Sequence, residues 1–120
     1  MRESKLWLLH LLAGAIIFFL LGLHMFIMHL DSILAWLGIG YREPIDAASV
    51  FARSRQAFFM VTYIILLGAA LYHGLYGLKN IINEMNLSHV IEKVIAGVLT
   101  VSGLILFAYG AYTAIFIFVK

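Results

Sequence analysis

Residues 6–30 read LWLLHLLAGAIIFFLLGLHMFIMHL, a run of 25 residues without Asp, Glu, Lys or Arg. Two further uncharged runs cover 23 residues from Gln56 to Leu78 and 26 residues from Val94 to Val119. A helix that crosses the hydrocarbon core needs roughly 20 apolar residues, and in lipid only a helix satisfies its own backbone hydrogen bonds locally. The sequence therefore predicts an all-α membrane protein. Its single membrane domain, residues 1–120, has three transmembrane helices, roughly over residues 6–30, 53–79 and 89–119.

The composition of the 120 residues excludes several other classes of protein. It is 64% hydrophobic and 12% charged, with a mean hydropathy of +1.04, whereas soluble domains are about half apolar and a quarter charged. A soluble enzyme is excluded. The net charge of +2 comes without a basic stripe, so nucleic acid is not an expected partner. Because the chain has no cysteine, it holds no disulfide and no cysteine-ligated iron–sulfur cluster, which leaves histidine for cofactor chemistry.

The connections between the uncharged runs indicate how the helices are joined. Residues 31–52 contain the only proline, and Asp46 is placed to cap a short helix at the membrane interface. Residues 80–88 form a short polar turn, so the helices on either side are expected to be antiparallel neighbours. The first run is too long for the apolar region of a signal peptide and is expected to stay attached. Four basic residues lie on each side of the membrane, so the positive-inside rule leaves the orientation open.

The histidines of the apolar runs need partners, because leaving a polar group unpaired in an apolar medium costs roughly 2–7 kcal/mol. Each either hydrogen-bonds to a neighbouring helix or is an axial ligand of a haem iron. Counted from the N-terminal side of the membrane, the helical rise places His24 about 25 Å deep and His73 about 9 Å deep. One iron cannot bind both. Residues 90–119 lack histidine, so we expect two b haems about 16 Å apart along the membrane normal, each completed by a partner chain.

The residues around these histidines have both a functional and a structural interpretation. Small residues one turn from His73, including Gly77, leave space for a porphyrin, or they allow tight helix packing. His29 is expected to pair with Asp31 at the interface, haem ligation being the alternative. His10 either meets a haem propionate or faces lipid headgroups. His89 is expected to be solvated.

Residues 71–79, Leu-Tyr-His-Gly-Leu-Tyr-Gly-Leu-Lys, are followed by Glu84 eleven positions after His73. This segment resembles the haem-ligand segment of the membrane anchor subunits of succinate dehydrogenase. Residues 22–26, Gly-Leu-His-Met-Phe, resemble the first-helix ligand segment of dihaem fumarate reductase cytochrome b subunits. The resemblance implies an anchor of the two-haem type that shares its b haems with a second membrane anchor subunit, so that this chain is half of a larger helical bundle. In it, His73 would serve the haem near the iron–sulfur subunit and His24 the distal haem.

The same resemblance implies a place in respiratory chain complex II and the tricarboxylic acid cycle. A flavoprotein subunit would oxidise succinate or reduce fumarate, and an iron–sulfur subunit would carry electrons to the membrane. This chain, a non-catalytic or quinone-reactive subunit, would then pass electrons between haem and quinone. It would lie in a prokaryotic plasma membrane with its N-terminal side facing the cytoplasm.

The family pattern also bears on the quinone. Ubiquinone-type anchors have a tyrosine directly after the loop acid, and this chain has Met85 after Glu84. A distal menaquinone site near Glu43 or Asp46 is therefore expected, where a carboxylate exchanges the quinol protons, with Glu84 a further candidate. Three alternative functions are a haemless structural anchor, a small transporter subunit, and a b-type cytochrome anchor of another dehydrogenase.

Overall fold

The computed structural model describes residues 2–39 and 46–120, apart from the side chain of Asp31. Its elements in chain order are α1 (Arg2–Trp36), α2 (Ala47–Ser54), α3 (Ala57–Asn83) and α4 (His89–Val119). The helices α1, α3 and α4 are long and apolar enough to cross a membrane. The predicted all-α fold with three spanning helices is confirmed.

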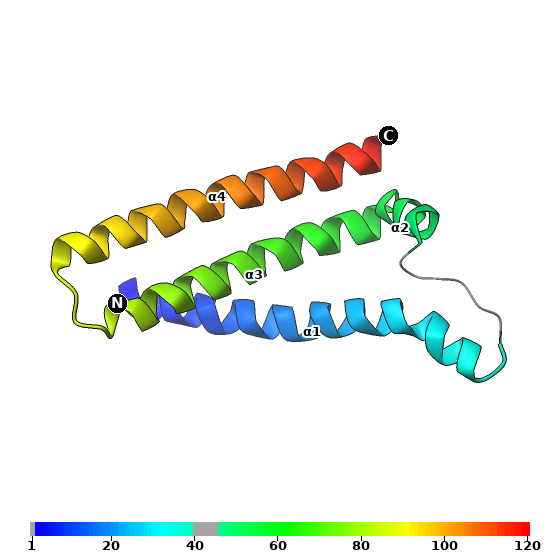
Figure 1. Ribbon diagram of the computed structural model, residues 1–120, viewed down its shortest axis with the longest axis horizontal. Coiled ribbons are helices and arrows are strands. Elements are labelled where there is room, and N and C mark those ends of the chain that lie inside the picture. The colour runs from blue at the N-terminus through cyan, green and yellow to red at the C-terminus, as the bar shows by residue number, and fades with distance from the viewer. Residues whose placement is uncertain (1, 40–45) are drawn as a thin grey trace.

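The three long helices lie in one row, with α3 in the middle of the layer (Figure 1). The middle helix, α3, runs antiparallel to both neighbours and packs against α1 on one side and α4 on the other, whereas in the described parts no Cα atom of α1 comes within 8 Å of one of α4. The N-terminus lies beside the turn between α3 and α4, and the C-terminus lies beside α2 at the opposite end. The short connection over residues 80–88 therefore joins antiparallel neighbours, as predicted.

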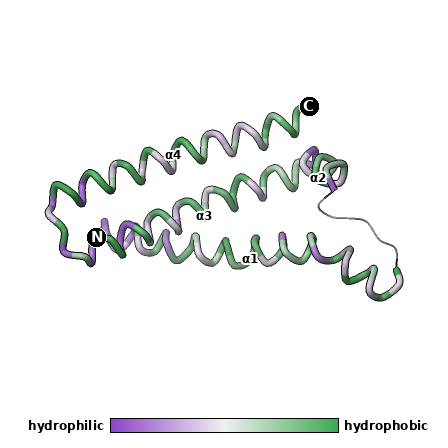
Figure 2. The backbone as a smooth tube through the Cα atoms, in the orientation of Figure 1, coloured by the Kyte–Doolittle hydropathy of each residue, from purple (hydrophilic) through white to green (hydrophobic). Residues whose placement is uncertain are grey.

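Almost nothing is buried within this layer. Ala13 is the only buried hydrophobic residue among those described, and large apolar side chains such as Phe18 and Phe19 are more than 70% exposed. Figure 2 shows hydrophobic residues along the whole length of all three long helices. Since water cannot solvate such a surface, lipid or other chains cover both faces of the layer.

The start of the second spanning helix differs from the prediction. The sequence placed it at residue 53, but α2 ends at Ser54 and a separate helix begins at Ala57. The backbone at Gln56 is extended (φ −93°, ψ 131°), which separates the two helices. Asp46 is the residue before α2, as expected, although its side chain makes no capping hydrogen bond. The short helix packs against α3 and α4.

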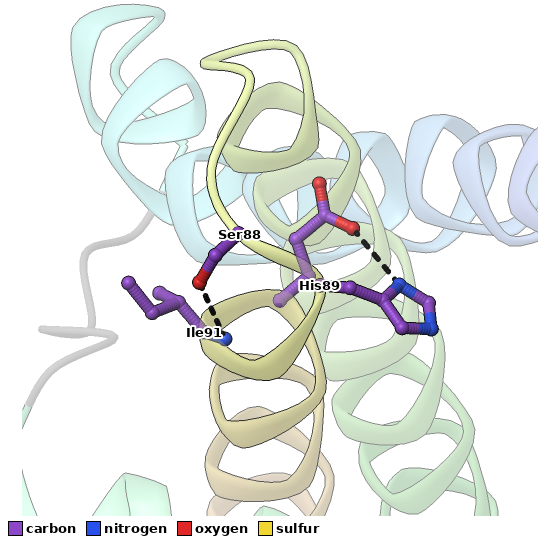
Figure 3. Close-up of polar contacts among 4 residues, drawn as sticks. Ser88, His89 and Ile91 are labelled. Carbon is purple, nitrogen blue, oxygen red and sulfur yellow. Dashed lines mark hydrogen bonds and ion pairs between the residues drawn. The ribbon is translucent and has the colours of Figure 1, made fainter.

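Ser88, in the polar turn, caps the N-terminus of α4 (Figure 3). The Ser88 hydroxyl accepts a hydrogen bond from the backbone N–H of Ile91 at 3.4 Å, which satisfies one of the free donors of the first turn. His89 Nδ1 lies 3.8 Å from a carboxylate oxygen of Glu92, and the His89 side chain is 81% exposed. The structure thus places His89 as an exposed side chain at the polar turn, before the uncharged run of α4.

Candidate functional site

His10 of α1 and His73 of α3 lie face to face near the N-terminal end of the layer. Their ring centroids are 4.1 Å apart, and the ring planes differ by 2°. His73 Nδ1 lies 3.0 Å from the backbone oxygen of His10. Because a carbonyl oxygen only accepts hydrogen bonds, Nδ1 carries the hydrogen and donates it. The other nitrogen of His73, Nε2, therefore keeps the lone pair that a metal ion needs.

Two glycines allow the imidazole rings to lie this close to the opposite helix. A Cβ atom at Gly14 of α1 would come within 3.0 Å of His73 Cε1, and one at Gly77 of α3 would come within 3.2 Å of His10 Cε1. Each ring thus lies over a glycine of the helix opposite. Within this chain, the space beside Gly77 that the sequence assigned to a porphyrin contains the His10 ring.

Tyrosine side chains of α3 hold the same end of α1. The Tyr72 hydroxyl donates a hydrogen bond of 2.8 Å to the backbone oxygen of Leu6. The ring of Tyr76 stacks on that of Tyr72 with a centroid separation of 5.6 Å, and it lies 5.3 Å from the His10 ring. These contacts, together with the bond from His73, fix the first turns of α1 against α3.

His24 lies at a second level of the same interface. Its half-buried ring meets the ring of Tyr63 edge to face, with centroids 5.9 Å apart and planes at 75°. The apolar cavity beside them has a volume of only about 20 Å³, room for about one water molecule. Tyr63 precedes His73 by ten residues of α3, which corresponds to about 15 Å. His24 and His73 are therefore too far apart to hold one group.

The remaining candidate residues do not join either histidine. His29 is exposed on α1, and the side chain of its expected partner, Asp31, lies outside the described residues. Glu43 also lies outside them. Asp46 is exposed ahead of α2, and Glu84 is exposed at the end of α3. Within residues 2–39 and 46–120, no three His, Asp or Glu side chains are grouped to hold a metal ion.

Two cavities along α3 are bordered by the tyrosines that contact the histidines but not by the histidines themselves. One, of about 470 Å³ between α3 and α4, is lined by apolar side chains together with Tyr72, Tyr76 and Lys79. The other, of about 290 Å³, lies toward the far end of the layer and includes Ser54 and Tyr63. No feature of the sequence pattern had indicated either cavity.

The sequence prediction for His10 did not include its contact with His73. Two features of the sequence could have indicated this contact. His10 lies three residues after Trp7, and His73 lies six residues before Lys79, so both fall within about 10 Å of the same membrane face. Both also stand four residues before a glycine.

Comparison with known proteins finds a relative that has a named role. The chain is 24% identical over 110 residues to the succinate dehydrogenase hydrophobic membrane anchor subunit of Archaeoglobus fulgidus. The matched region covers 92% of this chain and 86% of the relative. This likeness supports the family that the motifs around His73 resemble. No protein-family model matches the sequence, and no solved structure matches the chain.

Proposed function

We propose that this chain is a membrane anchor subunit of a succinate:quinone oxidoreductase that ligates b haems together with a partner anchor chain. It passes electrons between the iron–sulfur subunit and quinone. The observation that carries the proposal is His73, an imidazole in a spanning helix whose Nδ1–H is held by the His10 carbonyl. A ligating histidine usually donates its second nitrogen in this way. The full-length likeness to an anchor subunit supports the choice of complex.

The donor set fits haem better than a bare metal ion. Haem iron takes one or two histidine nitrogens, whereas a bare metal ion usually takes more protein ligands, and the described residues hold no group of three His, Cys, Asp or Glu side chains. At the His73 level the Nε2 lone pair is available, and at the His24 level the ring lies among apolar side chains. A bound b haem supplies reversible one-electron transfer. The role of this chain is then to hold its two imidazoles at two depths.

The shape of the chain supports a partner anchor. A layer with a single buried hydrophobic residue among those described has apolar faces to cover, and lipid alone would supply no further ligand to a haem held by His24 or His73. A second anchor chain packed on this layer would provide both ligands and cover. The flavoprotein and iron–sulfur subunits would attach at the N-terminal side, nearest His73, in a prokaryotic plasma membrane.

Haem content per flavin in the purified native complex tests the ligand assignment. We expect two b haems per flavin, one of which is lost in His73→Ala and the other in His24→Ala. His89→Ala is the matched control, because this histidine is exposed at the polar turn, and it should keep both haems. One haem per flavin would remove the role of His24. If the complex contains no haem, the chain is a haemless structural anchor. The observation that favours this alternative is that both histidines already have partners within the chain.

The quinone proposal places menaquinone at the far side, near Glu43 and Asp46. The supporting observation is that Asp46 is exposed ahead of α2, at the end of the layer opposite His73. Replacing Glu43 by Gln and Asp46 by Asn should lower quinone turnover severalfold. Flavin-site activity with a soluble acceptor should stay at the wild-type rate. Wild-type quinone turnover in both variants would refute this site, and the same assay on Glu84→Gln would then test the near side.

A further inference from the structure

The contact between His10 and His73 follows the same four-residue pattern on both helices. His10 stands four residues before Gly14 in α1, and His73 stands four residues before Gly77 in α3. Residues four apart lie on one face of a helix, and the two helices are antiparallel, so each histidine meets the glycine of the other. Gly14 leaves room for the His73 ring, and Gly77 leaves room for the His10 ring. The two motifs therefore form a reciprocal pair.

The hydrogen bonding of this pair is not reciprocal. His73 Nδ1–H donates to the His10 carbonyl at 3.0 Å, whereas His10 Nδ1 is buried and has no hydrogen-bond partner in the described residues. The His10 residue thus contributes two things to His73: a carbonyl acceptor and a flat ring stacked at 4.1 Å. Both act on the orientation of the His73 imidazole.

The stack cannot hold an iron between its rings. A metal–imidazole bond is about 2 Å long and lies along the nitrogen lone pair, in the plane of the ring. Two imidazoles on opposite sides of one iron therefore point their nitrogens at each other, whereas the rings of His10 and His73 lie in parallel planes with their faces in contact. In this arrangement His10 acts on His73 by contact and is not its trans partner on an iron.

We propose that His10 is a positioning residue for His73. The carbonyl and the ring of His10 set the tautomer and the ring plane of the His73 imidazole, which presents its Nε2 to the haem iron. The proposal rests on the proposed function, since it requires His73 to be a haem ligand. A hydrogen bond donated by a ligating histidine fixes its ring and raises its basicity. A more basic ligand favours oxidised iron, so weakening this bond raises the reduction potential of the haem.

Gly14→Ala tests the hydrogen bond without changing either histidine. The new Cβ would lie 3.0 Å from Cε1 and 3.2 Å from Nδ1 of His73, so the ring must shift by a few tenths of an ångström, which disturbs its hydrogen bond to the His10 carbonyl. In the assembled complex we expect the reduced-to-oxidised ratio of one haem to rise about tenfold at a fixed potential. This corresponds to an upward shift of about 59 mV for a one-electron couple. Gly97→Ala in α4 is the control, because no atom of a neighbouring side chain or helix lies within 4 Å of its added Cβ.

His10 variants test the ring separately, since the backbone carbonyl stays in place. His10→Phe keeps a flat ring but removes the ring nitrogens. Because Nδ1 of His10 makes no hydrogen bond in the described residues, we expect the wild-type haem potential and electron paramagnetic resonance signal. His10→Ala removes the ring, and we expect a displaced or broadened resonance of one haem and at least a twofold loss of that haem on purification. A role limited to packing α1 on α3 would lower thermal stability without moving the signal or the potential.

The outcomes separate this inference from the proposed function. If His73→Ala keeps every haem, the ligand assignment fails and the inference fails with it. If His73→Ala loses one haem, but the haem potentials and resonances of Gly14→Ala and of His10→Ala equal those of the wild type, the inference alone fails. Should the His10→Ala complex not assemble, the haem potentials of Gly14→Ala and Gly97→Ala are compared. A higher potential in Gly14→Ala alone supports the inference, and equal potentials refute it.

Discussion

Two neighbouring side chains of α3 donate hydrogen bonds to α1 backbone oxygens that lie one turn apart. Tyr72 donates to Leu6, and His73 donates to His10. A carbonyl oxygen has two lone pairs, so it accepts such a bond while keeping its bond within the helix. In lipid no water replaces a lost partner, and each bond therefore both satisfies a polar side chain and sets the register of the two helices.

Tyr72→Phe is expected to loosen α1 from α3. It removes the 2.8 Å bond to Leu6 and keeps the aromatic ring, so the free energy of unfolding should fall by about 0.5–1.5 kcal/mol. The measurement is the thermal midpoint of the purified complex in detergent. Tyr112→Phe on α4 is the matched control, since Tyr112 is 64% exposed. Equal shifts in the two variants would show that the bond to Leu6 contributes nothing to stability.

At the scale of helices, α3 meets its two neighbours through different chemistry. Toward α1 it presents His73, Tyr72 and Gly77, a polar and aromatic set. Toward α4 the contact depends on close approach at glycines: Gly103 of α4 lies against Leu75, and Gly110 lies against Leu67. Small residues at such positions let helix backbones approach, which drives association where lipid removes the hydrophobic effect. The polar interface carries the candidate site, and the other interface holds α4 in the layer.

Gly110→Leu is expected to separate α4 from α3. The side chain of Leu67 already occupies the space that any side chain at residue 110 would need. Overpacking of this kind costs about 1–3 kcal/mol, which the yield and thermal midpoint of the assembled complex would report. Gly97→Leu is the control on the same helix, because nothing lies within 4 Å of a Cβ there. A stable Gly110→Leu complex beside an unstable Gly97→Leu complex would contradict the packing described for α4.

The whole molecule is an open layer that crosses the membrane three times. Its N-terminus and the turn before α4 lie at one end, and α2 and the C-terminus lie at the other. The haem-ligand candidates sit at two depths of one interface, so electrons would travel across the membrane along α1 and α3. Both faces are exposed in this chain, so lipid or other chains cover them.

Cysteine labelling tests the three crossings, because the chain has no cysteine of its own. In sealed vesicles an impermeant maleimide should label Ser4→Cys and Ser88→Cys from one face, and Asp46→Cys and Lys120→Cys from the other. Ser102→Cys, in the middle of α4, should react from neither face. Labelling of Ser88→Cys and Lys120→Cys from the same face would refute the crossing of α4.

Sequence alone was enough to place the three spanning helices, since a run of 23 or more uncharged residues has one stable form in lipid, the helix. It also predicted that His24 and His73 lie at different depths, because the helical rise converts sequence position into depth. The break between α2 and α3 at Gln56 was not predicted: Arg53 and Arg55 mark a membrane boundary without showing where the chain turns.

Only the tertiary structure decided which side chains meet. Depth along the membrane follows from position in the sequence, but rotation about the helix axis does not, because apolar residues are spread around these helices and their few polar residues do not mark one face strongly. The stacking of His10 on His73, and the placing of each ring over a glycine of the other helix, depend on that rotation and on the register of α1 against α3. Close packing and two hydrogen bonds set both.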